Sequence, residues 1–314
     1  MVTEDFLVKK HLRLINKCLS ILPSAYVGFQ NSRPTVLFFL ISSLDILNKL
    51  DASIPQKEKS EIISWIYQLQ ITSSADFSAE SGGFRGSINT TNNCPTPDDL
   101  HSSLLFVDSW DDLKGVDRPS ILNGIRLINS ENDMRFVFCA VAICYILNDF
   151  SFIDVVKVRS FIQSSVNYDG GIGQGPFCES HGGSTYCAIA SLSMLGCLWD
   201  FSVLTKAQIE RLKNWAIMKQ KDGFHGRTNK PDDSCYAFWL GATLSMLNAQ
   251  YLVNETSVRS FLMRTQDDLI GGFSKYEDST SDALHTYFSI AAYLYLKSHC
   301  LPSLPTTQHF TEST

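Results

Sequence analysis

The feature that most constrains this chain is an internal repeat of about 50 residues. Four segments rich in apolar and small residues, DMRFVFCAVAICYIL, GSTYCAIASLSMLG, DSCYAFWLGATLSML and DALHTYFSIAAYLYL, begin at Asp133, Gly183, Asp233 and Asp282, which lie 50, 50 and 49 positions apart. Each segment is typical of a helix that is apolar on almost every side, and such a helix has to be buried. Repeats of this length predict similar units that stack on one another.

Amphipathic segments lie between the apolar ones. VVKVRSFIQSSV, KAQIERLKNWAIMKQ and ETSVRSFLMRTQ place charged and apolar residues at helical spacing, and each is followed by a glycine-rich turn. That spacing indicates a helix with one solvated face. The predicted unit is an exposed helix, a glycine loop and a buried helix, so the fold class is all-α. A closed ring, or α/α toroid, and an open solenoid both fit the pattern.

One unit of the repeat is incomplete. The glycine loops of the successive units contain Gly83, Gly171, Gly223 and Gly272, which are separated by 88, 52 and 49 positions. The long first interval lacks a loop, which indicates a repeat shortened around residues 95–135. We predict one domain over residues 1–300, followed by a polar, disordered tail over residues 301–314.

Composition limits the possible classes of protein. The chain has 314 residues, of which 44% are hydrophobic, and a net charge of -6, which argues against nucleic-acid binding. Its nine cysteines are odd in number and scattered, as in proteins that keep reduced thiols. No stretch approaches the ~20 apolar residues of a membrane span, and the charged N-terminus differs from a signal peptide. We expect a cytoplasmic protein with no membrane span.

Three metal-ligating residue types stand at the starts of two successive apolar segments. Asp233 and Cys235 begin one segment, and His285 lies near the start of the next. A carboxylate, a thiolate and an imidazole with one open position form a typical catalytic zinc shell. The alternative is an N-cap, a buried thiol and a core histidine. The spacing alone leaves both interpretations open.

Positively charged residues are predicted at the same end of the fold. His181, Arg227, Lys230 and Lys275 lie in the glycine loops, close to Tyr236. Cations beside helix N-termini make an anion site, for which a diphosphate is a good match. Ordinary solvated loop charges remain the alternative.

The motifs ESHGGSTYCAIASL, DGFHGRTNKPDDSCYAFWLGATL and GGFSKYEDSTSDALHTYF resemble the β subunits of protein prenyltransferases. The resemblance covers nearly the whole chain and is strongest to the type I geranylgeranyltransferases. It implies an α/α toroid, a separate α subunit as partner in a heterodimer, and transfer of a C20 geranylgeranyl group. The donor would be geranylgeranyl diphosphate, and the acceptor a protein that ends in Cys-aliphatic-aliphatic-Leu.

The resemblance also implies roles for single residues. One catalytic zinc ion would be held by Asp233, Cys235 and His285. Lys275 stands where farnesyltransferases have an acidic residue that serves magnesium, which predicts no magnesium requirement. Thr35 stands where they have a bulky Trp, which leaves room for the longer lipid. The other implied contacts are to the diphosphate (His181, Arg227, Lys230 and Tyr236, with Lys275), to the lipid (Phe39 and Trp239) and to the protein substrate (Glu131, Arg135 and His101).

The chain departs from the family pattern at the incomplete unit. RLINSENDMR stands where the family has a glycine loop rich in glutamine, and Phe138 replaces a usual Tyr. A subunit of farnesyltransferase or of Rab geranylgeranyltransferase shares the metal residues. A catalytically impaired interaction subunit is the alternative of a different class. A terpene cyclase shares the toroid, but PDDS is too short for its Asp-rich motif.

Overall fold

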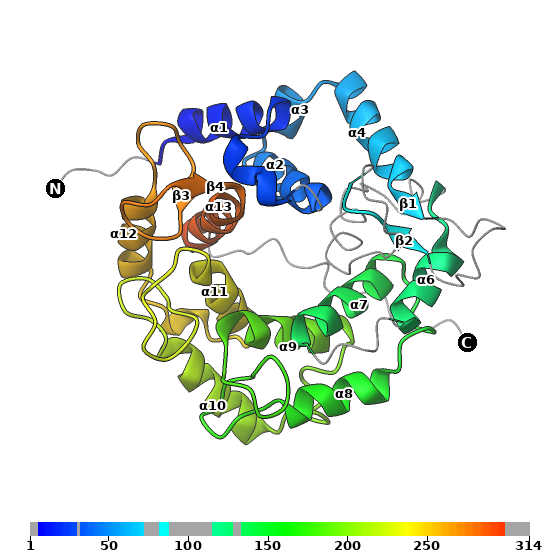
Figure 1. Ribbon diagram of the computed structural model, residues 1–314. Helices are drawn as coiled ribbons and strands as arrows, with labels where there is room; N and C mark the ends of the chain where they lie inside the picture. Colours follow the sequence, from blue (N-terminus) through cyan, green and yellow to red (C-terminus); the bar gives the residue numbers. More distant parts are fainter. Residues whose placement is uncertain (1–5, 30–31, 72–81, 88–114, 128–132, 299–314) are drawn as a thin grey trace.

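The computed structural model describes residues 6–29, 32–71, 82–87, 115–127 and 133–298. Their helices form a ring with an inner and an outer layer (Figure 1). The inner helices are α2 (Arg33–Ile46), α7 (Met134–Ile146), α9 (Gly182–Met194), α11 (Tyr236–Met246) and α13 (Ala283–Ser298). The outer helices are α1 (Val8–Ser20), α4 (Gln56–Gln68), α6 (Arg118–Leu127), α8 (Val155–Ser164), α10 (Lys206–Ile217) and α12 (Glu255–Thr265).

The remaining elements are short. Strand β1 (Gln70–Ile71) pairs antiparallel with β2 (Gly83–Phe84), and β3 (Phe273–Ser274) pairs antiparallel with β4 (Ser281–Asp282). The short helices are α3 (Leu50–Ser53), η1 (Ser24–Phe29) and η4 (Gln250–Leu252). The all-α class predicted from the repeat is therefore confirmed.

The outer helices α8, α10 and α12 are amphipathic helices that begin with polar caps. The side chain of Thr205 accepts a hydrogen bond from the backbone N–H of Gln208, and Oε1 of Gln208 accepts the backbone N–H of Thr205. Asp154 and Asn254 cap α8 and α12 in the same position. Such caps satisfy backbone donors that a helix start leaves without partners. The capping residues in the sequence therefore mark where α8, α10 and α12 start.

The inner helices α2, α7, α9 and α11 share one way of ending. After each helix, one residue takes a left-handed backbone conformation, with φ values of 53°, 50°, 68° and 53° at Asn48, Asn148, Gly196 and Asn248. The backbone N–H of the following residue then bonds a carbonyl in the last turn, as from Lys49 to Leu44 at 2.8 Å. Asparagine and glycine tolerate this conformation best. This shared signal reverses the chain from the inner to the outer layer.

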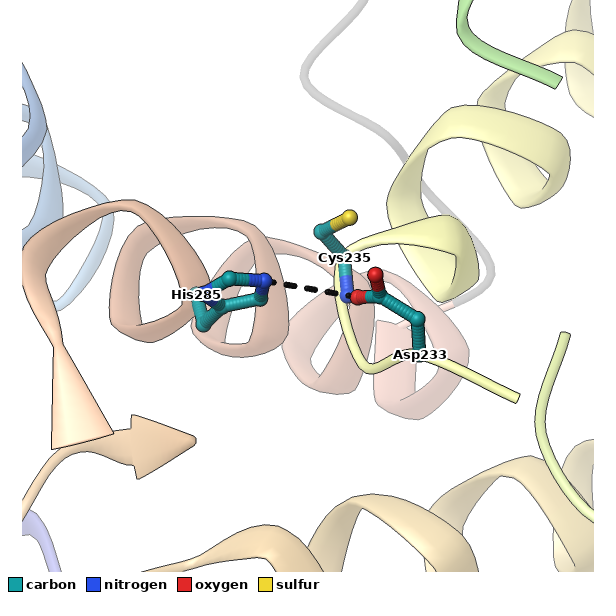
Figure 2. A group of neighbouring side chains, drawn as sticks. All are labelled: Asp233, Cys235 and His285. Atoms are coloured by element: carbon teal, nitrogen blue, oxygen red, sulfur yellow. Dashed lines mark hydrogen bonds and ion pairs between the residues drawn. The ribbon is translucent and has the colours of Figure 1, made fainter. Parts of the chain in front are cut away.

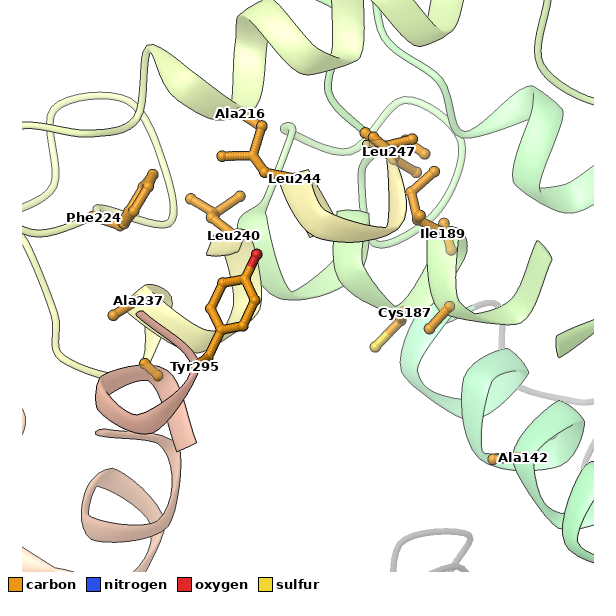
Figure 3. Packing of buried hydrophobic residues seen from close by; sticks show 14 of the residues in the cluster. Ala142, Cys187, Ile189, Ala216, Phe224, Ala237, Leu240, Leu244, Leu247 and Tyr295 are labelled. Carbon is orange, nitrogen blue, oxygen red and sulfur yellow. The ribbon is translucent and has the colours of Figure 1, made fainter. Parts of the chain in front are cut away.

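The ring closes between the last and the first inner helix. Contacts run from α7 through α9 and α11 to α13, and α13 also packs against α2. Figure 3 shows the packing around α11, where Leu244 and Leu247 belong to the same buried cluster as Ala216 of α10 and Ile189 of α9. The closed toroid, rather than the open solenoid, is the observed architecture.

One part of the ring is only partly described. Between α4 and α6 the described residues provide the strands β1 and β2, while residues 72–81 and 88–114 lie outside the described ranges. The long interval between the glycine loops, from Gly83 to Gly171, begins in this part of the chain. The predicted domain limits, the shortened repeat and the tail stay predictions, because most of residues 95–135 and all of residues 301–314 lie outside the described ranges.

Two further expectations concern cysteines and membranes. Every cysteine within the described ranges is a free thiol, which agrees with the predicted reduced state. Among the described helices, none is both long and apolar enough to cross a membrane.

A buried histidine joins α1 to the chain that leads into α13. His11 is 0% exposed. Its Nδ1 accepts the backbone N–H of Gly272 at 2.8 Å, so its proton lies on Nε2, which donates to Oε1 of Gln266 at 3.0 Å. The same Oε1 accepts the backbone N–H of Leu7 at 2.9 Å. Burial lowers the pKa of His11 to about 4, so the ring is neutral in the folded protein.

We expect this histidine to make the closed ring sensitive to acid. The unfolded chain binds a proton near the ordinary histidine pKa of about 6.5, whereas the folded pKa of His11 is about 4. The free energy of unfolding should therefore fall between about pH 6.5 and pH 4, by up to about 3 kcal/mol. Urea denaturation at pH 7.5 and pH 5.0 should show a smaller difference in His11→Gln than in the unchanged protein. An equal difference in both proteins would exclude His11 as the source.

Candidate metal and anion site

The three predicted metal ligands meet at one end of the ring. Asp233, Cys235 and His285 each offer one donor atom, and these atoms all lie within 4.8 Å of one another. Figure 2 shows His285 on α13 facing Asp233 and Cys235 at the start of α11. Asp233 and Cys235 are 5% and 7% exposed. The geometry brings together residues that are 50 positions apart in the chain, as the repeat predicted.

The start of α11 positions two of these side chains. Cys235 occupies the N-cap, and Asp233 lies in the loop before it, so the carboxylate is not the cap of this helix. Oδ1 of Asp233 accepts the backbone N–H of Cys235 at 3.0 Å. The equivalent bond at the start of α7 runs from the N–H of Arg135 to Oδ1 of Asp133, at 2.9 Å. The repeat therefore builds the same carboxylate turn twice.

A fourth residue, Asp282, orients the histidine. Its Oδ2 lies 2.6 Å from Nδ1 of His285, and its Oδ1 accepts the backbone N–H of His285 at 2.9 Å. A carboxylate bound to one ring nitrogen leaves the other nitrogen to face a metal, which is the usual arrangement behind metal-bound histidines. Sequence reasoning assigned Asp282 no role in the site. The sequence signal for this role is an Asp that lies three residues before a His at a helix start.

Electrostatics show that this cluster attracts positive charge. Burial lowers the pKa of His285, but its bonds to Asp233 and Asp282 outweigh that effect and raise the pKa to about 9. Burial opposes ionisation of Asp233 as well, yet hydrogen bonds from His285 and Cys235 lower its pKa. Nε2 of His285 lies 3.4 Å from Oδ1 of Asp233. A protonated His285 therefore supplies the positive charge that stabilises the buried Asp233 carboxylate.

The donor set fits zinc. Zinc accepts sulfur, nitrogen and oxygen ligands, and catalytic zinc sites have three protein ligands and one open position. Burial and the adjacent Asp233 raise the pKa of the Cys235 thiol well above its usual range. A divalent cation reverses that effect, since a coordinating thiol is deprotonated. Among the described residues this is the one cluster of three candidate ligands.

A histidine and a tyrosine from neighbouring inner helices meet beside the metal cluster. Nδ1 of His181 accepts the backbone N–H groups of Gly183 and Ser184 at 3.1 and 3.3 Å, so its proton lies on Nε2. Nε2 is 2.9 Å from the hydroxyl of Tyr236 and donates to it. The Tyr236 O–H is therefore oriented to donate elsewhere. A Cβ on Gly226 would lie 2.0 Å from the tyrosine ring, which explains a glycine at that position.

Of the predicted cations, Lys275 and Arg227 are electrostatically coupled to this end of the ring. Nζ of Lys275 lies 3.6 Å from Oδ2 of Asp233. The charge of Arg227 affects the pKa of both His181 and Tyr236. Lys230 lies in the same exposed loop as Arg227, and its backbone N–H bonds the Arg227 carbonyl at 3.3 Å. Lys275 and Arg227 therefore act on this end of the ring, and the diphosphate-binding roles of the four residues stay predictions.

Aromatic rings from four inner helices form a continuous group near the site. The ring centroid of Phe288 lies 4.4 Å from that of Trp239 and 5.7 Å from that of Phe39. Tyr186 stacks edge-on against Trp239 at 4.9 Å. Phe288 contacts both predicted lipid residues, and no sequence pattern indicated these contacts, because an aromatic residue on an apolar helix is most often explained by core packing.

The remaining predicted residues fall into two groups. Thr35 lies on α2 one turn before Phe39 and is half-buried. Arg135 lies in the first turn of α7. Glu131 and His101, predicted to contact the protein substrate, lie outside the described residues.

Comparison with known proteins identifies the fold and the family. Residues 6–310 match the prenyltransferase alpha-alpha toroid domain. The chain belongs to the prenyltransferase β-subunit family. It is similar to the geranylgeranyl transferase type-1 subunit beta of Dictyostelium discoideum, at 36% identity over 90% of this chain and 88% of that protein. The subunit of the same name from Arabidopsis thaliana is 33% identical over 96% of this chain and 88% of its own length.

A solved structure agrees with this assignment. The chain resembles the Candida albicans protein geranylgeranyltransferase-I complexed with GGPP, with a TM-score of 0.80 and 25% sequence identity. The likeness covers 94% of this prenyltransferase β subunit and 92% of the other chain. The toroid expected from the resemblance of the motifs is thus confirmed.

The zinc fit gives a direct prediction about Asp282. We expect Asp282→Asn to lower zinc affinity about tenfold, because removal of the carboxylate behind a metal-bound histidine commonly costs 10–100-fold. Cys235→Ala should lose zinc altogether. Metal content after dialysis against a graded chelator measures both effects. Asp268→Asn, which changes an exposed carboxylate before the β3–β4 hairpin, is the matched control. Full zinc retention by Cys235→Ala would contradict the ligand assignment.

Proposed function

We propose that this chain is the catalytic β subunit of a type I protein geranylgeranyltransferase that acts as a heterodimer with a separate α subunit. It transfers the C20 group of geranylgeranyl diphosphate to the cysteine of cytoplasmic proteins that end in Cys-aliphatic-aliphatic-Leu. Identity above 30% to two subunits of that name supports this proposal. So does the likeness to an enzyme complexed with GGPP.

One structural observation carries the proposal. A buried cluster of three zinc-type donors lies beside Lys275 and the His181–Tyr236 pair, on the inner helices that also present the aromatic group. A thiol substrate, a diphosphate and a long apolar chain each find matching chemistry there. Few other reactions require all three at once.

The metal would serve the attacking thiol. Asp233, Cys235 and His285 are the residues that would hold zinc. Zinc bound there would supply Lewis-acid chemistry, lowering the pKa of a substrate thiol from its usual value of about 8.5 so that the thiolate is present at neutral pH. Asp282 keeps the imidazole oriented by holding Nδ1.

The protein's own donors stabilise the leaving group. During transfer the cysteine sulfur forms a bond to C1 of the lipid while the bond between C1 and the diphosphate oxygen breaks, and the thiol proton is released. Negative charge then grows on the diphosphate, where Arg227, Lys230 and the Tyr236 hydroxyl would bind it. Donors aimed at developing charge often provide the largest part of catalysis.

Lys275 supports a reaction without magnesium. Partial burial lowers its pKa, but Tyr276 and Asp233 raise it by more, so the ammonium group is charged at neutral pH. A fixed positive charge there supplies what a magnesium ion would otherwise bring to the diphosphate. This is the reason to propose zinc as the sole metal cofactor.

The lipid pocket provides a test of substrate length. Thr35 precedes Phe39 by one turn of α2, and Phe39 contacts the aromatic group through Phe288. We expect Thr35→Trp to fill the far end of the pocket and to shift preference from geranylgeranyl toward farnesyl diphosphate by at least tenfold. Competition between the two labelled diphosphates in the heterodimer measures the shift, and Thr35→Ser is the control. An unchanged preference would contradict the pocket and would leave a farnesyltransferase or Rab-type role open.

The magnesium proposal is tested at Lys275. Lys275→Asp removes the ammonium group that lies 3.6 Å from Asp233 and adds a carboxylate. We expect the rate of transfer to fall about 100-fold without magnesium and to recover partly as magnesium is added, whereas the unchanged heterodimer should not respond. Lys275→Arg should keep the unchanged behaviour. A variant that is both fully active and indifferent to magnesium would remove Lys275 from the site.

A second candidate function is that of an interaction subunit. The interval of 88 positions between Gly83 and Gly171, which lacks one glycine loop of the repeat, favours it. Such a subunit would bind its α partner and zinc but would not turn over. Zinc near one per heterodimer without transfer would support this alternative, and transfer at a rate typical of enzymes would exclude it.

A further inference from the structure

Two of the predicted diphosphate-binding cations stand at the ends of one tight turn in the loop before α11. The backbone N–H of Lys230 donates to the carbonyl of Arg227 at 3.3 Å, and Asn229 takes a left-handed backbone conformation with a φ of 59°. All four residues of the turn, 227–230, are exposed. Exposed turns are among the least rigid parts of a fold unless other groups hold them. The directions of Arg227 and Lys230 therefore depend on what fixes this turn.

A buried lysine just after α10 holds the turn. Nζ of Lys219 donates to Oγ1 of Thr228 at 2.9 Å, and within the described chain this is the one side-chain hydrogen bond of residues 227–230. Lys219 is 7% exposed, and no carboxylate among the described residues forms an ion pair with it. A buried ammonium group without a counter-ion is costly. An apolar side chain would fill the position at less cost, so packing alone does not explain the lysine.

The ammonium group lies against a tryptophan ring that connects it to the neighbouring glycine loop. Nζ of Lys219 is 5.0 Å from the centroid of the Trp215 ring, within the range of a cation–π contact. Nε1 of Trp215 donates to Oδ2 of Asp169 at 3.0 Å, and Oδ1 of Asp169 accepts the hydroxyl of Ser180 at 2.6 Å. Ser180 directly precedes His181. A continuous set of contacts therefore runs from the residue before His181 to the turn.

A backbone hydrogen bond joins the same two loops directly. The N–H of Gly182, the first residue of α9, donates to the carbonyl of Gly226 at 2.8 Å. Gly182 follows His181 in the chain, and Gly226 precedes Arg227. Arg227 is thus held between a backbone bond at the preceding residue and the lysine bond at Thr228.

We propose that Lys219 is a positioning residue that presets Arg227 and Lys230 for the diphosphate, an inference that rests on the proposed function. A cation on a loosely held turn loses conformational freedom when it binds an anion, and a cation on a fixed turn has lost that freedom beforehand. Lys219 acts through the Thr228 hydroxyl and the turn, not by contact with the anion. Trp215 keeps the ammonium group in place and links the turn to the loop that carries His181.

Equilibrium binding of inorganic diphosphate to the heterodimer tests this role. Thr228→Val keeps the size of an exposed side chain and every charge, but it removes the acceptor of the Lys219 bond. We expect it to weaken diphosphate binding about tenfold, because the lost hydrogen bond involves a charged donor. Lys219→Met should weaken binding at least as much, and Thr228→Val should add nothing in that background. Thr228→Ser, which restores the hydroxyl, should recover most of the affinity.

Controls separate positioning from general damage. Lys206→Met, at the exposed start of α10, and Thr256→Val, at the exposed start of α12, should keep the full diphosphate affinity. The neutral alcohol geranylgeraniol carries no diphosphate, so its affinity should be unchanged in every variant.

Three results would overturn the inference. They are full diphosphate affinity in Thr228→Val, equal losses of diphosphate and geranylgeraniol binding, and no diphosphate binding by the unchanged heterodimer. A loss in Lys219→Met alone would indicate direct action of the lysine charge and would also exclude positioning through Thr228. Absence of transfer by an unchanged heterodimer that binds diphosphate would overturn the proposed function instead, and the diphosphate affinities would still decide the role of Lys219.

Discussion

The structure depends on the burial of inner helices that have no polar face. A helix such as α11 is covered by α9 and α13 on its two sides and by α10 behind it. An open array would leave the flanks of its first and last inner helices in water. Contact between α13 and α2 removes both exposed flanks at once, and His11 with Gln266 supports the same junction from the outer layer. Closure also brings the glycine loops to one end.

The repeat uses its carboxylates at helix starts in three different ways. Asp133 caps α7 and holds a guanidinium, Asp233 turns the chain into α11 and faces the metal cluster, and Asp282 holds the imidazole of His285. In each case a backbone N–H at the helix start donates a hydrogen bond to the carboxylate. The same carboxylate turn thus serves three purposes: Asp133 binds an arginine, Asp233 is a candidate metal ligand, and Asp282 orients a candidate metal ligand. Function differs between repeats mainly because the residue two or three positions later differs.

The periodic part of the fold was predictable, and so was the metal cluster. A repeat of fixed length places equivalent positions at equivalent depth, so Asp233, Cys235 and His285 could be expected to meet. The contacts of Phe288 with Phe39 and Trp239 could not be read from the chain, because aromatic residues on apolar helices give the same sequence signal whichever rings they contact. The bond from Gly272 to His11 joins residues 261 positions apart, and no local pattern indicates such a partner. The assignment of Glu131 and His101 depends on the interval where the period is lost.

The junction between α13 and α2 has a consequence for folding during synthesis on the ribosome. The chain leaves the ribosome N-terminus first, so α2 is made early and α13 is made after the other described helices. Until α13 has been made, the flank of α2 that it will cover has no partner. Contacts between distant parts of a chain form slowly, and apolar surface that waits for its partner invites aggregation. The toroid is therefore completed only after α13 has left the ribosome, and a nascent chain that stalls before α13 presents an apolar flank to chaperones.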